Sequence, residues 1–313
     1  MTHRRAVGLM LLVTLLWSTA GVVTLHLEAA RGFELTFWRS AFTALALILM
    51  LVGLRGAALW GQLRRAPRVV WASGLCWAMM FTAFMVALSL TRVANVLVTM
   101  ALGPLLTALM AWLFLHHRVQ ARTWAAIALA TVGIAWMFGH ELGSPDSLVG
   151  MGVALGVPLA AALNWCLLQH DSHGGLGRDG ERSDMPLAVL LGALMSASVA
   201  LPLAWPLQAS AHDLTLLAGL GIFQLALPCL LVVRLARKLP GPELALLGQL
   251  ELVLGVLWAW VGAGEVPSTA ALVGGAMVLA ALVGNELLGW RIARLAPTAL
   301  RPLPQSRIPR SPA

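Results

Sequence analysis

The chain has 313 residues, of which 59% are apolar and 11% are charged, and its mean hydropathy is +0.85. An ordinary soluble domain has about 45–50% apolar and 25% charged residues, so this composition excludes that class. The net charge of +8 does not indicate a nucleic-acid partner, because the basic residues lie at the ends of apolar segments, where they report membrane topology.

Ten stretches of the sequence are apolar enough and long enough to cross a membrane. About 20 helical residues, at about 1.5 Å each, span the roughly 30 Å of hydrocarbon in a bilayer. We therefore predict an all-α integral membrane protein with ten transmembrane helices. In chain order, the predicted spans are residues 7–27, 34–54, 69–90, 94–115, 123–139, 148–169, 186–206, 214–234, 242–262 and 268–290.

The chain also matches itself, without a gap, at a spacing of 148 residues, so that Trp17 aligns with Trp165 and Trp112 aligns with Trp260. A duplicated membrane fold builds its site at the interface between the copies. Each copy holds five predicted spans, and because five is odd the second copy enters the membrane in the opposite sense. The sequence thus predicts two inverted five-helix repeats that work by alternating access. The predicted repeats are residues 6–140 and 148–290.

The first predicted span follows His3-Arg4-Arg5 and also fits a secretory signal peptide. Its repeat partner at residues 154–169 cannot be a signal, so we predict that the segment is retained as a membrane span. Within the fourth span, Pro104 removes one backbone hydrogen-bond donor and predicts a bend or break in that helix.

The basic residues predict the orientation. If the amino terminus is cytoplasmic, all 21 basic residues except Arg31, Arg39 and Arg92 lie on the cytoplasmic side, as the positive-inside rule requires. We therefore predict a multi-pass protein of the inner (plasma) membrane with both termini in the cytoplasm. The glycine-rich segment 170–185 is predicted to be a flexible connector, and the proline-rich segment 291–313 a disordered cytoplasmic tail.

Two charged residues lie farthest from the ends of the predicted spans. Glu251 lies near the middle of the ninth, and Arg39 lies about five residues, roughly 7 Å, into the second. A charge in hydrocarbon costs at least about 2.5–3.5 kcal/mol, so both are candidates for a functional site. Glu251 is interpreted as a proton-titrating group or a counter-charge for a cationic substrate, or else as a hydrogen-bonded structural glutamate. Arg39 has three interpretations: its side chain snorkels to the membrane surface, it holds a substrate carboxylate, or it pairs with Glu251.

Neutral polar and aromatic side chains form a second group of candidates. Asn164 and Gln224 can exchange hydrogen bonds with a substrate, although helix–helix contact is the commoner use of such residues. Trp17 and Trp165 are related by the repeat, and their indoles either line a central cavity that grips an apolar or aromatic metabolite or pack structurally.

Enzyme chemistry has little support in the sequence. Cys76, Cys166 and Cys229 are isolated within spans, and the adjacent His116 and His117 point to different sides of a helix, so no metal site is predicted. No phosphate-binding loop, nucleophile elbow or His-Glu-x-x-His motif occurs. We expect no cofactor, no ATP coupling and no enzymatic activity.

Runs in both halves resemble the third-to-fourth-span signature of the EamA domain of the drug/metabolite transporter superfamily. They are Ala87–Asn95 and Leu102–Leu115 in the first half, and Leu250–Val253, Trp258–Trp260 and Gly264–Glu265 in the second. The resemblance covers about residues 6–290 and implies a ten-span carrier, usually an exporter of amino acids or other small metabolites. The chain departs from the family where His116-His117-Arg118 stands for Gly-Glu-Arg and Leu250-Glu251-Leu252 stands for Leu-Glu-Pro.

We expect a secondary transporter that exports a small metabolite, such as an amino acid, with protons as a candidate coupling ion. An importer or facilitative carrier is the alternative within transport. An integral-membrane enzyme or a structural membrane protein is the alternative of another class. The expected partners are a small-molecule substrate and the lipid bilayer, and small-residue pairs such as Ala126 with Ala130 add a homodimer as a further candidate.

Overall fold

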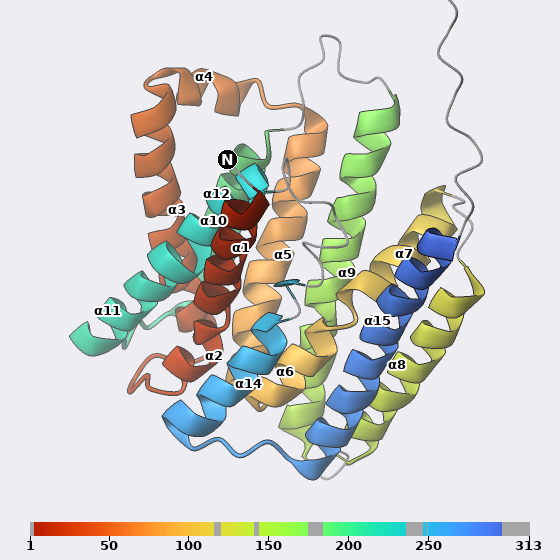
Figure 1. The fold of residues 1–313 in the computed structure, drawn as a ribbon. Coiled ribbons are helices and arrows are strands. Elements are labelled where there is room, and N and C mark those ends of the chain that lie inside the picture. Colours follow the sequence, from red (N-terminus) through yellow and green to blue (C-terminus); the bar gives the residue numbers. More distant parts are fainter. Residues whose placement is uncertain are drawn as a thin grey trace, which may run out of the picture.

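The computed structural model describes residues 3–115, 120–140, 144–174, 184–235, 247–248 and 250–295. Throughout these ranges the chain is built from helices and contains no strand (Figure 1). By length and composition, nine helical segments of the described part can cross a membrane. The prediction of an all-α, multi-pass membrane protein is thereby confirmed.

The helices have the following bounds: α1 (His3–Trp17), α2 (Thr19–Thr24), α3 (Phe33–Arg55), α4 (Ala58–Arg64), α5 (Arg68–Leu90), α6 (Val93–Met100), α7 (Gly103–Leu115), α8 (Ala121–His140), α9 (Pro145–Gly174), α10 (Met185–Ala204), α11 (Ala211–Gly219), the π-helix η1 (Leu220–Ala226), α12 (Leu227–Leu235), α14 (Leu250–Ala263) and α15 (Thr269–Leu295). Three spans are composite, since α1 continues into α2, α6 into α7, and α11 through η1 into α12.

The ninth predicted span, 242–262, lies partly outside the described residues, and its described part is mainly the 14-residue α14. The count of ten spans therefore stays a prediction. Helix α9 continues to Gly174, so the first residues of the predicted connector 170–185 are helical and that part of the prediction is wrong. The physical reason is that no proline or glycine stands between Leu159 and His173 to stop the helix. Helix α15 likewise runs past residue 290 to Leu295.

Local chemistry explains two of the breaks inside spans. The predicted break near Pro104 is confirmed, because α6 ends at Met100 and α7 starts at Gly103. The break at Ser18 was not predicted. There the Ser18 hydroxyl donates to the carbonyl of Leu15 at 2.8 Å. Such back-bonding competes with the helical hydrogen bonds and bends helices.

The helices pack in pairs that link distant parts of the chain. Helix α5 packs against α9 and α10, α3 packs against α10 and η1, and α8 packs against α15. Helix α1 lies against α12, and α14 lies against α6. Figure 1 shows α8 and α15 running side by side. Their backbones approach closely, because a Cβ atom added to Gly133 would lie 2.9 Å from the carbonyl oxygen of Gly274. Small residues permit this kind of contact between membrane helices.

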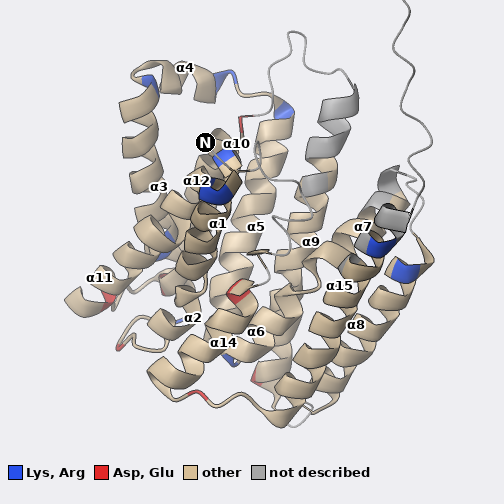
Figure 2. Cartoon of the chain, in the orientation of Figure 1, with Lys and Arg blue, Asp and Glu red and all other residues tan. Residues whose placement is uncertain are grey.

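Charge separates the two ends of the bundle. Figure 2 shows blue residues gathered at the end where the amino terminus, α4 and the start of α5 lie, and red residues mainly at the opposite end. Helix α3 ends at Arg55, α4 ends at Arg64 and α5 begins at Arg68. Between the two ends, the helices carry few charged residues (Figure 2).

At the acidic end, one carboxylate joins two segments that are far apart in sequence. Asp213, in the first turn of α11, is fully buried. It accepts hydrogen bonds from the backbone N–H groups of Glu28 at 2.8 Å and of Ala29 and Ala30 at 2.9 Å each, and from that of Ser210 at 3.3 Å. It therefore holds the loop after α2 against the start of α11.

We expect Asp213→Ala to lower the free energy of unfolding by about 3 kcal/mol or more, because each orphaned buried N–H costs about 1–3 kcal/mol. Titration of the purified protein with sodium dodecyl sulfate measures this loss. The control is Asp146→Ala, since Asp146 is an exposed acid in the first turn of α9, and its removal should change stability by less than about 0.5 kcal/mol. Equal effects of the two substitutions would contradict the assignment.

Candidate functional site

Arg39 is the most unusual side chain in the described interior. It lies on α3 with 2% of its surface exposed, so it does not reach water by snorkelling. Its guanidinium carbon lies 5.4 Å from the ring centre of Phe84 and 6.0 Å from that of Phe81, both on α5. Among the described residues, its Nε and Nη1 atoms have no hydrogen-bond partner. A buried charge without partners is costly, so Arg39 is a strong candidate for a functional residue.

The backbone at Arg39 is held by the π-helix. A Cβ atom added to Gly221 of η1 would lie 2.8 Å from the carbonyl oxygen of Arg39, so only glycine allows this approach. The Thr43 hydroxyl contacts both helices, at 2.7 Å from the carbonyl of Arg39 and 3.1 Å from that of Gly221. These contacts fix the position of α3 where it presents the guanidinium. Single π-helical turns inside spans occur frequently at functional sites.

Hydroxyl groups continue the polar region from α3 to α5 and α10. Ser196 on α10 is fully buried, and its Oγ lies 3.0 Å from Ser40 Oγ and 2.9 Å from Thr82 Oγ1. The Thr36 hydroxyl, one turn before Ser40, is buried without a hydrogen-bond partner. Ser73 and Trp77 on α5 also keep buried polar atoms without a partner. Buried polar atoms are normally paired, so each of these unpaired atoms is an exception within the described part of the chain.

Glu251 lies in the first turn of α14 and is half-buried. It interacts electrostatically with Arg39 and with Cys229 of α12. Within the described part of the chain, Glu251 and Arg39 form no direct ion pair. The structure therefore brings these two predicted residues into one electrostatic environment, and Nε and Nη1 of Arg39 have no hydrogen-bond partner in the described part.

The other candidates from the sequence are placed less closely together. Gln224 lies on η1, buried, and its Nε2 donates to the carbonyl oxygen of Trp17 at 3.3 Å. It is the backbone of Trp17 that makes this contact, while its indole packs among apolar residues of α1 and α12. Asn164 on α9 is buried, with no partner for its Oδ1. The side chain of Trp165 lies outside the described part, so a pair of facing indoles stays a prediction.

Sequence reasoning missed Phe81, Phe84 and the hydroxyls around Ser196. An aromatic residue or a serine in a membrane span is common, and nothing in its spacing marks it as a neighbour of Arg39. Only the charged residues could be recognised as candidates from their position inside an apolar segment. In the described ranges no group of three His, Cys, Asp or Glu residues could hold a metal ion, and His116 and His117 lie outside those ranges.

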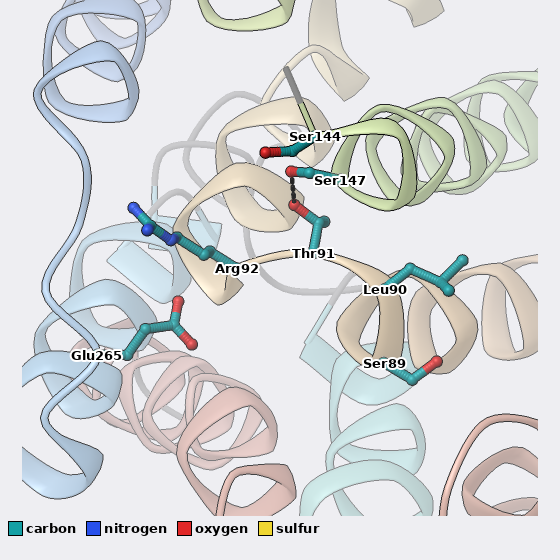
Figure 3. Close-up of a pocket in the computed structure, with 7 residues that line it drawn as sticks. All are labelled: Ser89, Leu90, Thr91, Arg92, Ser144, Ser147 and Glu265. Atoms are coloured by element: carbon teal, nitrogen blue, oxygen red, sulfur yellow. Dashed lines mark hydrogen bonds between the residues drawn. The ribbon is translucent and has the colours of Figure 1, made fainter. Parts of the chain in front are cut away.

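A polar pocket of about 370 Å³ opens at the acidic end of the bundle. Figure 3 shows its lining: Ser89, Leu90, Thr91, Arg92, Ser144, Ser147 and Glu265. These residues come from the end of α5 and the turn that follows it, from the start of α9 and the residue before it, and from the segment between α14 and α15. The hydroxyls of Thr91 and Ser147 hydrogen bond at 2.6 Å. The pocket thus places a cation, a carboxylate and several hydroxyl groups together at the acidic end of the bundle.

Glu265 links the segment between α14 and α15 to the start of α6 beside this pocket. Its carboxylate accepts the backbone N–H of Val93, at the start of α6, at 2.7 Å. Burial raises the pKa of the Glu265 carboxyl, although the Val93 N–H and the nearby Arg92 partly offset the rise. Because the pKa is higher in the folded than in the unfolded protein, this group contributes most stability below its unfolded pKa. That contribution is lost as the pH rises through the folded pKa.

We expect Glu265→Gln to keep the contact to Val93 and to remove this part of the pH dependence, so that the variant is at least as stable as the natural protein at about pH 8. Glu265→Ala should lose about 1 kcal/mol, the usual cost of removing a helix cap. Thermal unfolding of the purified proteins from about pH 4 to about pH 8 compares the three. A glutamine variant with the pH profile of the natural protein would contradict the role of the carboxyl.

The comparisons with known proteins agree with this architecture. Residues 4–139 match the EamA-like transporter family, which confirms the resemblance over the first predicted repeat. A solved structure, described only as the crystal structure of a protein, is 20% identical, with a TM-score of 0.62 over 94% of this chain and 99% of that chain. At this identity the likeness concerns the fold alone. The comparison with curated proteins found no match.

Proposed function

We propose that this multi-pass membrane protein is a secondary transporter of the drug/metabolite transporter superfamily, because residues 4–139 match the EamA-like transporter family. It exports a small metabolite that carries a carboxylate, such as an amino acid, across the inner membrane by alternating access. Homodimer formation remains a secondary part of the proposal.

One observation carries the proposal, namely the buried guanidinium of Arg39 with two nitrogen atoms that lack a hydrogen-bond partner. A guanidinium recognises a carboxylate through parallel N–H···O bonds. The neighbouring Phe81 and Phe84 rings exclude water and attract the cation, which strengthens its interaction with an anion. An arginine inside a span that faces a ligand path is typical of transporters.

The packing pattern supports two inverted repeats. A two-fold axis that exchanges the halves would place each span of the first half on the corresponding span of the second. It would turn the contact between α5 and α9 into the contact between α12 and α1. It would likewise turn the contact between α5 and α10 into the contact between η1 and α3. It would map the pairs α3–α10, α8–α15 and α6–α14 onto themselves. All of these contacts occur. A carrier of this symmetry has two related arrangements, one open to each side of the membrane.

The separation of charges supports the orientation. The end with the amino terminus and α4 is rich in basic residues (Figure 2), and the positive-inside rule places such an end in the cytoplasm. The polar pocket at Arg92 and Glu265 then lies at the outer mouth, where a released substrate leaves. Glu251 supplies a titratable group inside the membrane for proton coupling, and its electrostatic interaction with Arg39 links protonation to the carboxylate site.

A metabolite-resistance screen tests the function. Cells that overexpress the protein should survive toxic levels of the exported carboxylate, and efflux of each hit is then measured directly. The expected result is faster efflux from the overexpressing cells than from cells that carry Arg39→Gln. Direction-resolved flux in vesicles separates an exporter from an importer or a facilitative carrier. Resistance that arises through conversion of the metabolite, without efflux, would support the membrane-enzyme alternative.

A further inference from the structure

The polar pocket at the acidic end of the bundle is lined by one positive and one negative side chain, Arg92 and Glu265 (Figure 3). The two interact electrostatically, but within the part of the chain that the structure describes no ion pair joins them. Arg92 is exposed, and Glu265 is only partly buried. Both charges are therefore accessible to a small molecule that enters the pocket from the surrounding water.

The guanidinium of Arg92 is available to an anionic group. Among the described residues, its N–H groups form no hydrogen bond. A guanidinium presents five N–H donors in a planar fork, and this fork matches the two oxygens of a carboxylate. Arg92 can therefore bind a carboxylate in the pocket without first breaking another contact.

Hydroxyl groups add a further donor on another side of the pocket (Figure 3). Thr91 Oγ1 and Ser147 Oγ lie 2.6 Å apart, and Asn95 Nδ2 donates to them at 3.1 Å and 3.5 Å. Each hydroxyl has one proton, and only one of the two protons can lie in the bond between the oxygens. The other proton cannot go to the Asn95 nitrogen, which only donates. It is therefore available to an acceptor atom of a ligand.

Glu265 supplies an acceptor for a positively charged group. Its Oε1 accepts the backbone N–H of Val93 at 2.7 Å, and the N–H of Ala94 also stabilises the carboxylate. A carboxylate has about four lone-pair sites, so these two backbone groups leave capacity for a further donor. An ammonium group is such a donor, and its hydrogen bond to a carboxylate is charge-assisted.

The two charges together select the kind of ligand. A simple anion would be attracted by Arg92 but repelled by Glu265, and a simple cation would meet the reverse. A molecule that carries both charges satisfies both side chains. The pocket volume of about 370 Å³ lies within the range of small-molecule sites, about 300–1,000 Å³.

We propose that the polar pocket binds a small zwitterion, with its carboxylate on Arg92 and the neighbouring hydroxyl groups and its ammonium group on Glu265. The pocket shares no lining residue with the site around Arg39, Phe81 and Phe84. Only its placement on the outer side of the membrane rests on the proposed function.

The test uses the purified full chain with Arg39→Gln, in lipid nanodiscs, so that the proposed carboxylate site around Arg39 does not contribute. Equilibrium dialysis at about pH 8 measures binding of radiolabelled L-alanine. We expect saturable binding. L-Alaninamide lacks the carboxylate and L-lactate lacks the ammonium group, so each should compete about 10-fold more weakly than unlabelled L-alanine, the loss expected for one charge-assisted hydrogen bond. No saturable binding, or equal competition by the three compounds, would overturn the proposal.

Two variants assign the two charges. Arg92→Gln should let L-alaninamide compete as well as L-alanine, and Glu265→Gln should let L-lactate do so, while each weakens binding of L-alanine about 10-fold. The matched controls are Arg31→Gln and Glu28→Gln, because both residues are exposed between α2 and α3 at the same end and do not line the pocket. They should bind L-alanine like the parent chain.

Unchanged binding and competition in folded Arg92→Gln or Glu265→Gln protein would also contradict the site. Because every sample carries Arg39→Gln, this result is independent of the efflux experiments. The transport proposal can fail while the zwitterion site is confirmed, and the reverse also holds.

Discussion

Replacing Arg39 by glutamine is expected to lower efflux of a carboxylate substrate by about 100-fold, because loss of two charge-assisted hydrogen bonds costs about 3 kcal/mol or more and each 1.4 kcal/mol is a factor of ten. The natural protein is expected to reject the uncharged amide of the substrate, whereas the variant should discriminate poorly between the acid and the amide. Efflux from loaded vesicles, measured for the acid and the amide, reports both effects. The comparison with the amide separates loss of recognition from general damage.

Two further variants sharpen this prediction. Arg39→Lys keeps the charge but loses the planar fork, so it should recover part of the efflux. Arg64→Gln removes an exposed cation at the end of α4 and should leave efflux unchanged. A folded Arg39→Gln protein with natural efflux of the acid would disprove the carboxylate site.

Glu251→Gln is expected to abolish the pH dependence of efflux between about pH 5 and about pH 8, since glutamine keeps the shape of the side chain but cannot carry a proton. In the natural protein, a proton on Glu251 removes a charge that interacts with Arg39. The occupancy of the proposed carboxylate site is therefore expected to change with protonation. Efflux into buffers of fixed pH, with and without an imposed proton gradient, measures the coupling.

The matched control for Glu251→Gln is Glu34→Gln. Glu34 is buried more deeply than Glu251, and its Oε1 accepts the backbone N–H groups of Gln208 and Ala209 at 2.8 Å each, where an amide oxygen can replace it. This variant should keep the natural pH profile. If Glu251→Gln and the natural protein show the same profile, protons do not couple through Glu251.

Much of the fold follows from the sequence because bilayer thickness imposes a simple rule. A chain in hydrocarbon must satisfy its backbone within helices, so apolar runs of about 20 residues become spans. The break near Pro104 follows from the missing N–H of proline. The π-helix η1 could not be predicted, since it depends on contacts with α3 that are distant in sequence. The break at Ser18 was not predicted either, because a serine hydroxyl that bonds back to its own helix does not bend every helix.

The residues of the candidate site likewise fall into those that the sequence identifies and those that only the structure identifies. Arg39 and Glu251 are recognisable in the sequence because a charge in an apolar run has few structural explanations. Gln224 is recognisable as polar, but its contact with the carbonyl of Trp17 depends on how the two segments pack. Phe81 and Ser196 carry no such signal, because their importance comes from what lies next to them.

The sequence by itself determined that the chain is helical, lies in a membrane and carries isolated charges at membrane depth, since these depend on composition and on local hydrogen bonding. Only the tertiary structure decided which polar atoms have partners. Whether Arg39 reaches water, contacts a carboxylate or lies over aromatic rings depends on the packing of α3 against α5, α10 and η1. Whether a polar atom has a hydrogen-bond partner depends on which residues lie next to it in space. The sequence alone does not identify these neighbours, because they are set by the packing of the helices.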